Sequence, residues 1–233
     1  MEGLEKRLQI IFSLFLIFII NFLCMAETNP LDNTLRFQIW ALIDEVPSLQ
    51  IKHDKTKQQY QFSVDRIKTL APFVLEGMIY GWKFTYTPYD KRRNINEFFE
   101  FECIKSFEKE INMIQYEKPY LKDGKMLCWI RFDRTEQMMH WRASWNSINN
   151  PKISGVGQGN LTDGFEGVEN AYAEALKNAV RTYAQGLTRN KPKEITGTVF
   201  LYNIPKLLIR SGKYEAHLDF FLTIDKIVPY KFF

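Results

Sequence analysis

The chain has 233 residues, carries a formal net charge of +4 and is 45% hydrophobic and 15% aromatic. Its charges are spread along the sequence and no segment is low-complexity, which excludes a largely disordered chain and a strongly basic nucleic-acid-binding protein. The length suffices for one sizeable domain or two small ones. We therefore expect a folded, aromatic-rich protein without a nucleic-acid partner.

Residues 1–26 have the organisation of a signal peptide. Two cations, Lys6 and Arg7, precede a long apolar run. Small residues occupy the two positions that a cleavage site requires just before the cut. We predict cleavage between Ala26 and Glu27, which leaves the remainder as an exported domain.

Two alternatives to cleavage stay open. The apolar run is about 19 residues long, so it could instead span a bilayer once, with its flanking cations inside. Cys24 could be lipidated, although Leu23 is larger than the residue that normally precedes a lipidated cysteine. In each case residues 27–233 lie outside the cytoplasm, as a periplasmic or envelope-associated, membrane-anchored or secreted domain. The membrane is contacted only through the N-terminal segment, if that segment is not cleaved.

The first half of the exported region predicts a strand, a helix and several further strands. Residues 36–44 alternate apolar and polar side chains, which is typical of a strand. Ser63 is suited to cap a helix over residues 64–80, which Pro72 should kink or divide. Alternation and turn signals, including a hairpin turn at Asp123-Gly124, predict strands at 82–86, 97–107, 111–116, 125–133 and 137–146.

An alanine-rich helix over residues 166–185 is the central element of the second half. Asp163 marks its start and Gly186 its end. Small side chains recur along it at near-helical spacing, at Ala171, Ala175 and Ala179. Such a face lets a helix lie close on a sheet, and the flanking sequence, including predicted strands at 194–202 and 213–225, could supply that sheet.

The segment before this helix is rich in glycine. Gly155, Gly157 and Gly159 lie in a connection of residues 146–167, and glycine loses more backbone freedom on ordering than any other residue. We therefore predict a mobile loop that, together with Asn160, contributes to a binding surface. The glycine spacing differs from that of dinucleotide- and phosphate-binding loops, so no nucleotide site is expected.

Two cysteines remain after cleavage. Cys103 and Cys128 each lie on the apolar side of a predicted strand, so both thiols should point inward. Two buried free thiols are the simpler interpretation. A disulfide between them is the alternative, because disulfides persist in the compartments that exported proteins reach.

The sequence lacks a catalytic or metal-binding signature. No nucleophile elbow is present, and no recognised metal-ligand spacing surrounds any of the histidines, His53, His140 and His217. The densest group of cations, Lys91-Arg92-Arg93, is interpreted as a solvated turn. We interpret Trp141 and Trp145 as core residues of a strand. The expectation is a non-enzymatic protein without cofactor or metal.

A Gly-x-Gly turn, an alanine-bearing helix and a strand with Gly-x-Val follow one another over residues 155–202. The positions that carry this pattern are Gly157, Gly159, Ala171, Ala175, Ala179, Gly197 and Val199. In this order the region resembles the repeated N-terminal domain of the flagellar assembly T protein and its exported lipoprotein relatives. The resemblance implies an accessory protein of the envelope or flagellar motor, with no catalytic residues to carry over.

These features together predict an α+β fold with a largely antiparallel sheet and two main helices, 64–80 and 166–185. The exported region forms either one domain or two related lobes that meet near residues 108–124. The expected function is that of an exported, non-enzymatic cell-envelope protein that binds an envelope protein partner. A periplasmic or secreted module that binds a small molecule or a glycan is the alternative.

Overall fold

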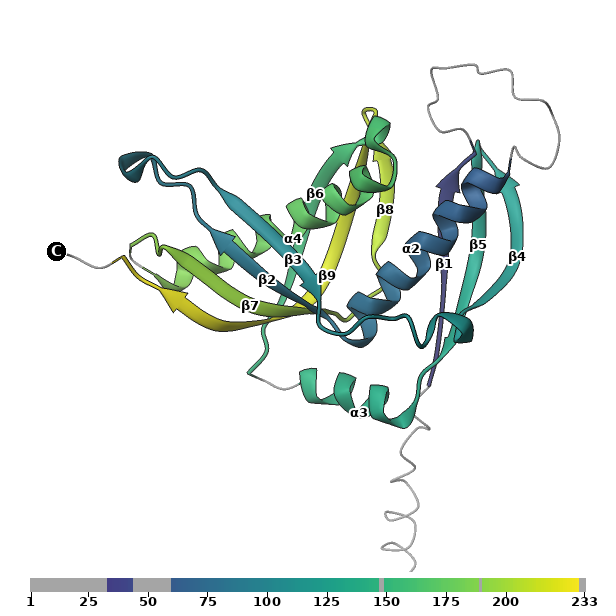
Figure 1. Cartoon of the computed structure of the whole chain (residues 1–233), viewed down its shortest axis with the longest axis horizontal. Coiled ribbons are helices and arrows are strands. Elements are labelled where there is room, and N and C mark those ends of the chain that lie inside the picture. The colour runs from purple at the N-terminus through teal and green to yellow at the C-terminus, as the bar shows by residue number, and fades with distance from the viewer. Residues whose placement is uncertain (1–32, 44–59, 147–148, 189, 231–233) are drawn as a thin grey trace, which may run out of the picture. The chain divides into compact units, whose positions relative to one another are not determined.

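The computed structural model describes residues 33–43, 60–146, 149–188 and 190–230. The predicted signal peptide with its cleavage site at Ala26 and Glu27, the polar segment 47–59 and His53 lie outside the described residues. From Thr34 onward the chain forms one compact unit. Its described part contains two sheets, every strand pair of which is antiparallel, and three α-helices (Figure 1).

Sheet A has three strands in the order β1-β5-β4: β1 (Thr34–Leu42), β5 (Lys125–Asp133) and β4 (Gln115–Lys122). Sheet B has the order β3-β2-β7-β9-β6, with β8 also paired to β9. Its strands are β3 (Phe98–Cys103), β2 (Trp82–Thr87), β7 (Glu194–Leu201), β9 (Lys213–Val228), β6 (Lys152–Asn160) and β8 (Lys206–Arg210). The long strand β9 pairs with β6 and β8 through its N-terminal half and with β7 through its C-terminal half.

The helices are α2 (Gln61–Ile79), α3 (Glu136–Trp145) and α4 (Phe165–Leu187). The predicted α+β class with two main helices is confirmed. None of the described helices is both long and apolar enough to cross a membrane. The hairpin turn predicted at Asp123-Gly124 joins β4 to β5, and both of its residues have the positive φ angles that such a turn requires.

The start of α2 differs from the prediction. The helix begins at Gln61, and Ser63 lies inside it as a buried residue whose Oγ donates to the carbonyl of Leu42 at 2.8 Å. The hydroxyl therefore ties α2 to the end of β1 and does not cap the helix. Pro72 is accommodated within the continuous helix and does not divide it.

The predicted strand over residues 137–146 is a helix, α3. Thr135 caps it by accepting a hydrogen bond from the backbone N–H of Met138 at 3.3 Å. Met138 and Trp145, seven residues apart and so two turns from each other, are the buried side chains. Trp145 stacks on Phe200 with ring centroids 5.5 Å apart. The alternation of apolar residues here was misleading, because the helical spacing decides which side chains are buried.

The predicted mobile glycine loop is also wrong, since residues 152–160 form strand β6. This strand pairs with β9 without interruption, from Lys152 opposite Phe221 to Asn160 opposite Lys213. Its glycines recur at every second position, so from residue 155 to residue 159 one face of the strand has no side chains. The backbone of α4 lies directly against that face.

The contact between α4 and β6 leaves no room for a side chain on the strand. A Cβ atom on Gly157 would overlap the backbone of α4 at Ala171 and Ala175, and one on Gly155 would overlap the carbonyl of Ala175. The predicted face of Ala171, Ala175 and Ala179 is buried at this contact. The helix runs from Phe165 to Leu187, so Asp163 lies just before the N-cap residue Gly164, and Gly186 lies within the last turn.

Replacing Gly157 with alanine should lower the free energy of unfolding by about 1–3 kcal/mol or more, because the new methyl group meets backbone atoms of α4. Gly186→Ala is the matched control. Nothing lies within 4 Å of its Cβ position, so this helical alanine should leave stability unchanged or raise it by up to about 1 kcal/mol. Urea unfolding of both variants tests this, and equal stabilities would refute the close packing of α4 on β6.

Candidate functional site

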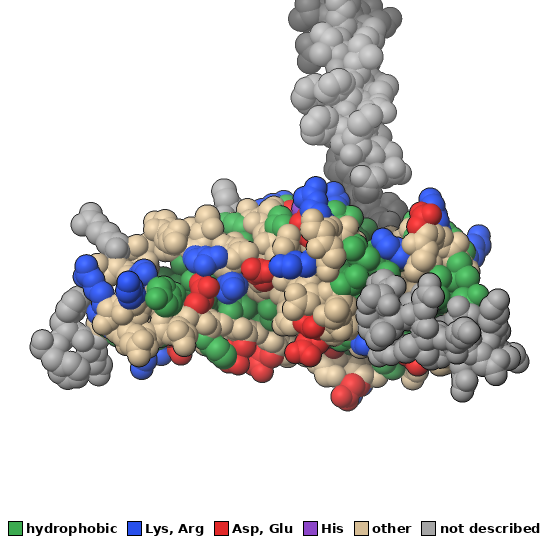
Figure 2. Space-filling model, turned by 90° about the horizontal axis from the view of Figure 1, so that it is seen from above, with side chains coloured by type: hydrophobic (Ala, Val, Ile, Leu, Met, Phe, Trp, Pro, Cys, Tyr) green, Lys and Arg blue, Asp and Glu red, His purple; other side chains and the backbone are tan. Residues whose placement is uncertain are grey.

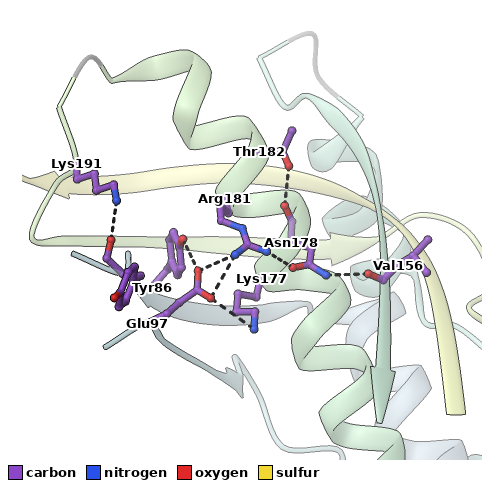
Figure 3. Close-up of polar contacts among 9 residues, drawn as sticks. Tyr86, Glu97, Val156, Lys177, Asn178, Arg181, Thr182 and Lys191 are labelled. Carbon is purple, nitrogen blue, oxygen red and sulfur yellow. Dashed lines mark hydrogen bonds and ion pairs between the residues drawn. The ribbon is translucent and has the colours of Figure 1, made fainter. Parts of the chain in front are cut away.

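A polar cluster joins α4 to the start of β3 (Figure 3). Glu97 accepts hydrogen bonds from the hydroxyl of Tyr86 at 2.9 Å and from Arg181 Nη1 at 3.2 Å, and Lys177 Nζ lies 3.7 Å away. Burial, reinforced by the hydrogen bond to Glu97, raises the pKa of Tyr86 well above its ordinary value. Both carboxylate oxygens of Glu97 are engaged by protein groups, so this cluster fixes the helix rather than offering a free acid.

The other side of α4 covers the free edge of β6. Asn178 Nδ2 donates to the carbonyl of Val156 at 3.0 Å, and Glu174 Oε2 accepts the backbone N–H of Gln158 at 2.8 Å. Asn178 Oδ1 also accepts from Arg181 (Figure 3). These side chains occupy backbone groups that an edge strand would otherwise present to another chain.

A cleft opens next to the Glu97 cluster, at the C-terminal end of α4. Its inner part has a volume of about 460 Å³ and lies between α4, the connection from β2 to β3 and residues 190–192. Its outer part, about 990 Å³, shares Thr188, Asn190, Lys191 and Pro192 with the inner part and extends to the end of β9. We call these two parts together the basic cleft.

Cations dominate the outer part of the basic cleft. Its charged lining residues are Lys91, Arg92, Arg93 and Lys191 against one carboxylate, Asp90. Figure 2 shows basic side chains gathered at the end of the molecule where Figure 1 places the turn between β2 and β3. A lining with this excess of positive charge favours anionic groups.

The basic turn is rigidly built. The carboxylate of Asp90 accepts the backbone N–H groups of Arg92 at 2.9 Å and Arg93 at 3.3 Å, and thereby caps the single 3₁₀ turn Lys91–Arg93. Arg93 Nη1 also lies 2.5 Å from Asp90 Oδ2. The hydrogen bond from Arg93 lowers the pKa of Asp90, so this carboxylate stays charged and holds the turn.

Two aromatic residues hold cations at the walls of the cleft. Arg93 lies over the ring of Tyr230, with its Cζ 3.9 Å from the ring centroid. Lys191 Nζ donates to the carbonyl of Tyr89 at 2.9 Å (Figure 3). Among the described residues no ion pair involves Lys91 or Arg92, which are exposed. These two cations are therefore the ones available to a binding partner.

The chemistry of the cleft suits the binding of anionic groups. Its lining contains no cysteine, serine or histidine that could act as a nucleophile or general base. In the part of the chain that the structure describes, no group of His, Cys, Asp and Glu could hold a metal ion. The arrangement can neutralise carboxylate or phosphate groups and pack against apolar portions of a ligand.

A second polar cluster lies on the face of sheet B opposite α4. The buried carboxylate of Glu215 accepts hydrogen bonds from Gln158 Nε2 at 3.0 Å and Arg210 Nη1 at 3.3 Å, and lies 2.9 Å from His217 Nε2. The hydrogen bond with His217 is the main reason that the pKa of Glu215 lies below its ordinary value. Three partners satisfy this carboxylate, which indicates a role in joining β6, β8 and β9.

The residues that the sequence suggested as a binding surface lie elsewhere. Gly155, Gly157 and Gly159 are covered by α4, which removes the physical basis on which they were expected to bind. Asn160 ends β6, and its Nδ2 donates to Asp163 at 3.2 Å. None of these four residues lines the basic cleft.

The two cysteines are both free thiols and lie in different sheets, Cys103 on β3 and Cys128 on β5. Cys103 Sγ donates to the carbonyl of Lys105 at 2.7 Å. Burial, followed by the nearby carboxylate of Glu76, raises the pKa of Cys103 to about 11. Burial also raises the pKa of Cys128. Both thiols are thus held in the form that is least reactive.

Sequence reasoning found the basic turn but not the surface that it forms. The run Lys91-Arg92-Arg93 predicts a solvated turn, and nothing in the sequence places Lys191 beside it, about a hundred residues away. The period-two recurrence of glycine was the signal that could have identified β6. Glycine at every second residue leaves one face of a strand without side chains, and alanine at every fourth residue leaves one face of a helix with only small ones. The two faces can therefore pack closely together.

Comparison with known proteins identifies the family but no activity. A family model matches residues 23–230, so the chain belongs to this family of uncharacterised proteins. An uncharacterised protein of Treponema pallidum (strain Nichols) is 27% identical to this chain over 203 residues, which are 84% of this chain and 82% of that protein. No solved structure matches the chain significantly.

The thiol of Cys103 should react slowly with iodoacetamide at neutral pH, and its rate should rise until the pH approaches about 11, because only the thiolate is nucleophilic. Mass spectrometry of the alkylated peptide measures this rate, and the urea-unfolded chain supplies the reference. Rapid labelling of Cys103 in the folded protein near pH 8 would contradict its raised pKa, and an intact mass that shows a disulfide would contradict the two free thiols.

The Glu215 cluster should make the free energy of unfolding depend on pH in the acidic range. The pKa of this carboxyl is lower in the folded than in the unfolded chain, so its contribution is present above the unfolded value of 4.5 and is lost as the pH falls through the folded value. Glu215→Gln should therefore be less stable than the original protein at neutral pH, and the difference should shrink on acidification. Urea unfolding from about pH 5 to about pH 3 tests this. Glu102→Gln, an exposed glutamate, controls for the lost charge.

Proposed function

We propose that this chain is an exported, non-enzymatic protein of the cell envelope that acts by binding another protein, and that the basic cleft receives an acidic segment of that partner. The observation that carries the proposal is the lining of the outer part of the cleft, where four cations face one carboxylate that is itself engaged by Arg93. A binding function needs such a preformed, charged recess and no catalytic group.

The shape of the cleft supports a macromolecular partner. Its outer part of about 990 Å³ is at the upper end of the range for small-molecule pockets, and it continues into the inner part past Lys191. The two exposed cations, Lys91 and Arg92, stand on a turn that Asp90 holds in place. A rigid, cationic rim favours recognition of a chain segment that carries several carboxylates, because little ordering of the protein is needed on binding.

Export and envelope location rest on the sequence. The cations and apolar run of residues 1–26 support a signal peptide, and the family model begins only at residue 23, near the end of that segment. The resemblance of residues 155–202 to the flagellar assembly T protein supports a place as an accessory of an envelope or flagellar assembly. The lining of the cleft contains no cysteine, serine or histidine, and its carboxylates, Asp90 and Glu97, are engaged by arginines, which supports a role without catalysis.

Charge reversal in the cleft tests the proposal. Lys91→Glu/Arg92→Glu should reduce the amount of partner recovered by affinity capture from envelope fractions by at least tenfold, because two attractive charges become repulsive. Both side chains are exposed, so the unfolding midpoint should not change. Lys68→Glu/Lys109→Glu makes the same change in net charge at exposed positions that do not line the cleft, and it should retain the partner.

Three outcomes would overturn this function. Equal capture by both double variants would show that the cleft is not the contact surface. Binding of nucleic acid that the cleft variant abolishes would assign the cations to a different class of partner. A thermal shift by a small anionic compound, with no protein recovered in complex, would favour the alternative of a small-molecule-binding module.

A further inference from the structure

A second surface lies between the two sheets, where β1 of sheet A and β8 of sheet B come close to each other. Among the described strands each lies at an edge, because β1 pairs only with β5 and β8 only with β9. Trp40 Nε1 donates to the carbonyl of Leu207 at 3.1 Å and bridges the two edges. A side chain, and not a strand hydrogen bond, spans the gap, so the edges are held apart. We call this gap the seam.

The backbone of β8 directs hydrogen-bonding groups into the seam, and the side chain of Trp40 occupies one of them, the carbonyl of Leu207. The carbonyl of Leu207 faces Trp40 and hence points away from β9. Because residues two apart in a strand direct their backbone groups to the same side, Ile209 faces the seam as well. In the described part of the chain no backbone hydrogen bond joins β1 to β8. Pro205, which has no N–H to offer, sits at the start of this edge.

The floor of the seam is apolar. A groove of about 290 Å³ lies between residues 37–40 of β1 and residues 204–208, and Leu70, Val74 and Tyr172 of the two main helices form its base. A smaller pocket with Phe165, Val168 and Tyr214 among its lining residues continues on the other side of the Trp40–Leu207 contact. Ile204 and Leu208 at the rim are 46% and 47% exposed, so apolar surface remains uncovered here.

The charged residues that line the seam are cations. Among the described residues that line the groove and the smaller pocket, the charged ones are Lys206 and Arg66, both cations. Arg66 lies over the ring of Phe62, and Lys206 is exposed on β8. A segment that enters the seam therefore meets apolar side chains below and positive charge at both ends.

We propose that the seam binds an extended acidic segment of a partner protein, which adds as a strand between β1 and β8 and joins the two sheets. The inserted strand would lie about 4.8 Å from each edge, and its backbone would replace Trp40 as the partner of the Leu207 carbonyl. Alternate side chains of the segment would lie on Leu70, Val74 and Tyr172. The remaining side chains, facing outward, include carboxylates that pair with Lys206 and Arg66.

Because β1 and β8 flank the seam on both sides, the edge of another folded sheet does not fit into it. The edge strand of a second copy of this chain brings its own neighbouring strand with it, and that neighbour would collide with β1 or β8. A single extended segment has both edges free, which matches a gap bounded by strands on both sides. β1 and the hairpin turn of β8 and β9 point to the same end of the molecule in Figure 1, so the segment can run antiparallel to both strands.

Binding at the seam does not depend on the basic cleft. None of the residues that line the seam also lines the cleft. The Lys91→Glu/Arg92→Glu variant should thus retain binding at the seam, and variants of the seam should retain binding at the basic cleft. A failure of one surface is therefore distinguishable from a failure of the other.

Amide hydrogen exchange with a defined probe tests the proposal. The probe is a synthetic peptide of alternating valine and glutamate, and the matched control peptide has lysine in place of glutamate. On the full chain, saturation with the acidic peptide should slow exchange of the Leu207 and Ile209 amides by at least tenfold, since these N–H groups become bonded. The fluorescence of Trp40 should change in parallel, and the lysine peptide should have neither effect.

Charge reversal at the rim supplies the second measurement. Lys206→Glu should lower the affinity for the acidic peptide by about tenfold and raise the affinity for the lysine peptide. Lys122→Glu, an exposed lysine at the far edge of sheet A, should leave both affinities unchanged. Both positions are on the surface, so both variants should fold.

Four results would overturn the proposal. Unchanged exchange at Leu207 and Ile209 with the acidic peptide would show that no strand is added. Slow exchange at these amides in the isolated monomer would show that the seam is already filled by the chain itself. Protection that appears only as the protein dimerises would assign the seam to a second copy. Equal affinities of the Lys206→Glu and Lys122→Glu variants for the acidic peptide would remove the charge argument.

Discussion

The contact between the backbone of α4 and the glycine face of β6 is the constraint on which the rest of sheet B depends. Gly155, Gly157 and Gly159 have no side chains on that face. The helix packs against them with its small side chains, those of Ala171, Ala175 and Ala179. Helix and strand therefore approach more closely than ordinary core side chains allow. The fit is specific in register, because a shift of one residue along β6 would turn the bare face away from the helix.

This close approach also determines what the flanks of α4 can reach. On one flank Asn178 and Glu174 satisfy backbone groups of β6, and on the other Arg181 and Lys177 hold Glu97. The helix thus covers one edge of sheet B and anchors the start of β3 near the other. Its C-terminal end is left beside the turn between β2 and β3, and the cations that gather there define the basic cleft. The cleft is a consequence of where the glycines allow the helix to lie.

Sequence patterns predicted the elements whose burial follows a single period. Strand β5 was predicted with its observed bounds, and the alanine face of α4 with its buried residues, because in each the apolar spacing reflects one packed side. The patterns failed where the packing is unusual. The glycines of β6 predict flexibility by their backbone freedom, although the same absence of side chains is what a tightly covered strand needs. In α3 the apolar residues alternate by chance, and the cap at Thr135 was the more reliable signal. The basic cleft and the seam could not be predicted, since both combine residues far apart in the chain.

The seam follows from the way in which the two sheets are joined. Helix α2 packs on sheet A, α4 packs on sheet B, and the aromatic ring of Phe73 on α2 contacts Tyr172 of α4 and Trp82 of β2 at centroid distances of 5.1 and 5.2 Å. Such ring pairs contribute about 0.5–1.5 kcal/mol each beyond the area that they bury. The helices thus supply one continuous core beneath two separate sheets. Because the union lies in the helical layer, the sheets need not pair with each other, and β1 and β8 keep their free edges. Asn178 and Glu174 shield the edge of β6. The edges of β1 and β8, in contrast, face each other over an apolar floor, where one more strand can bind.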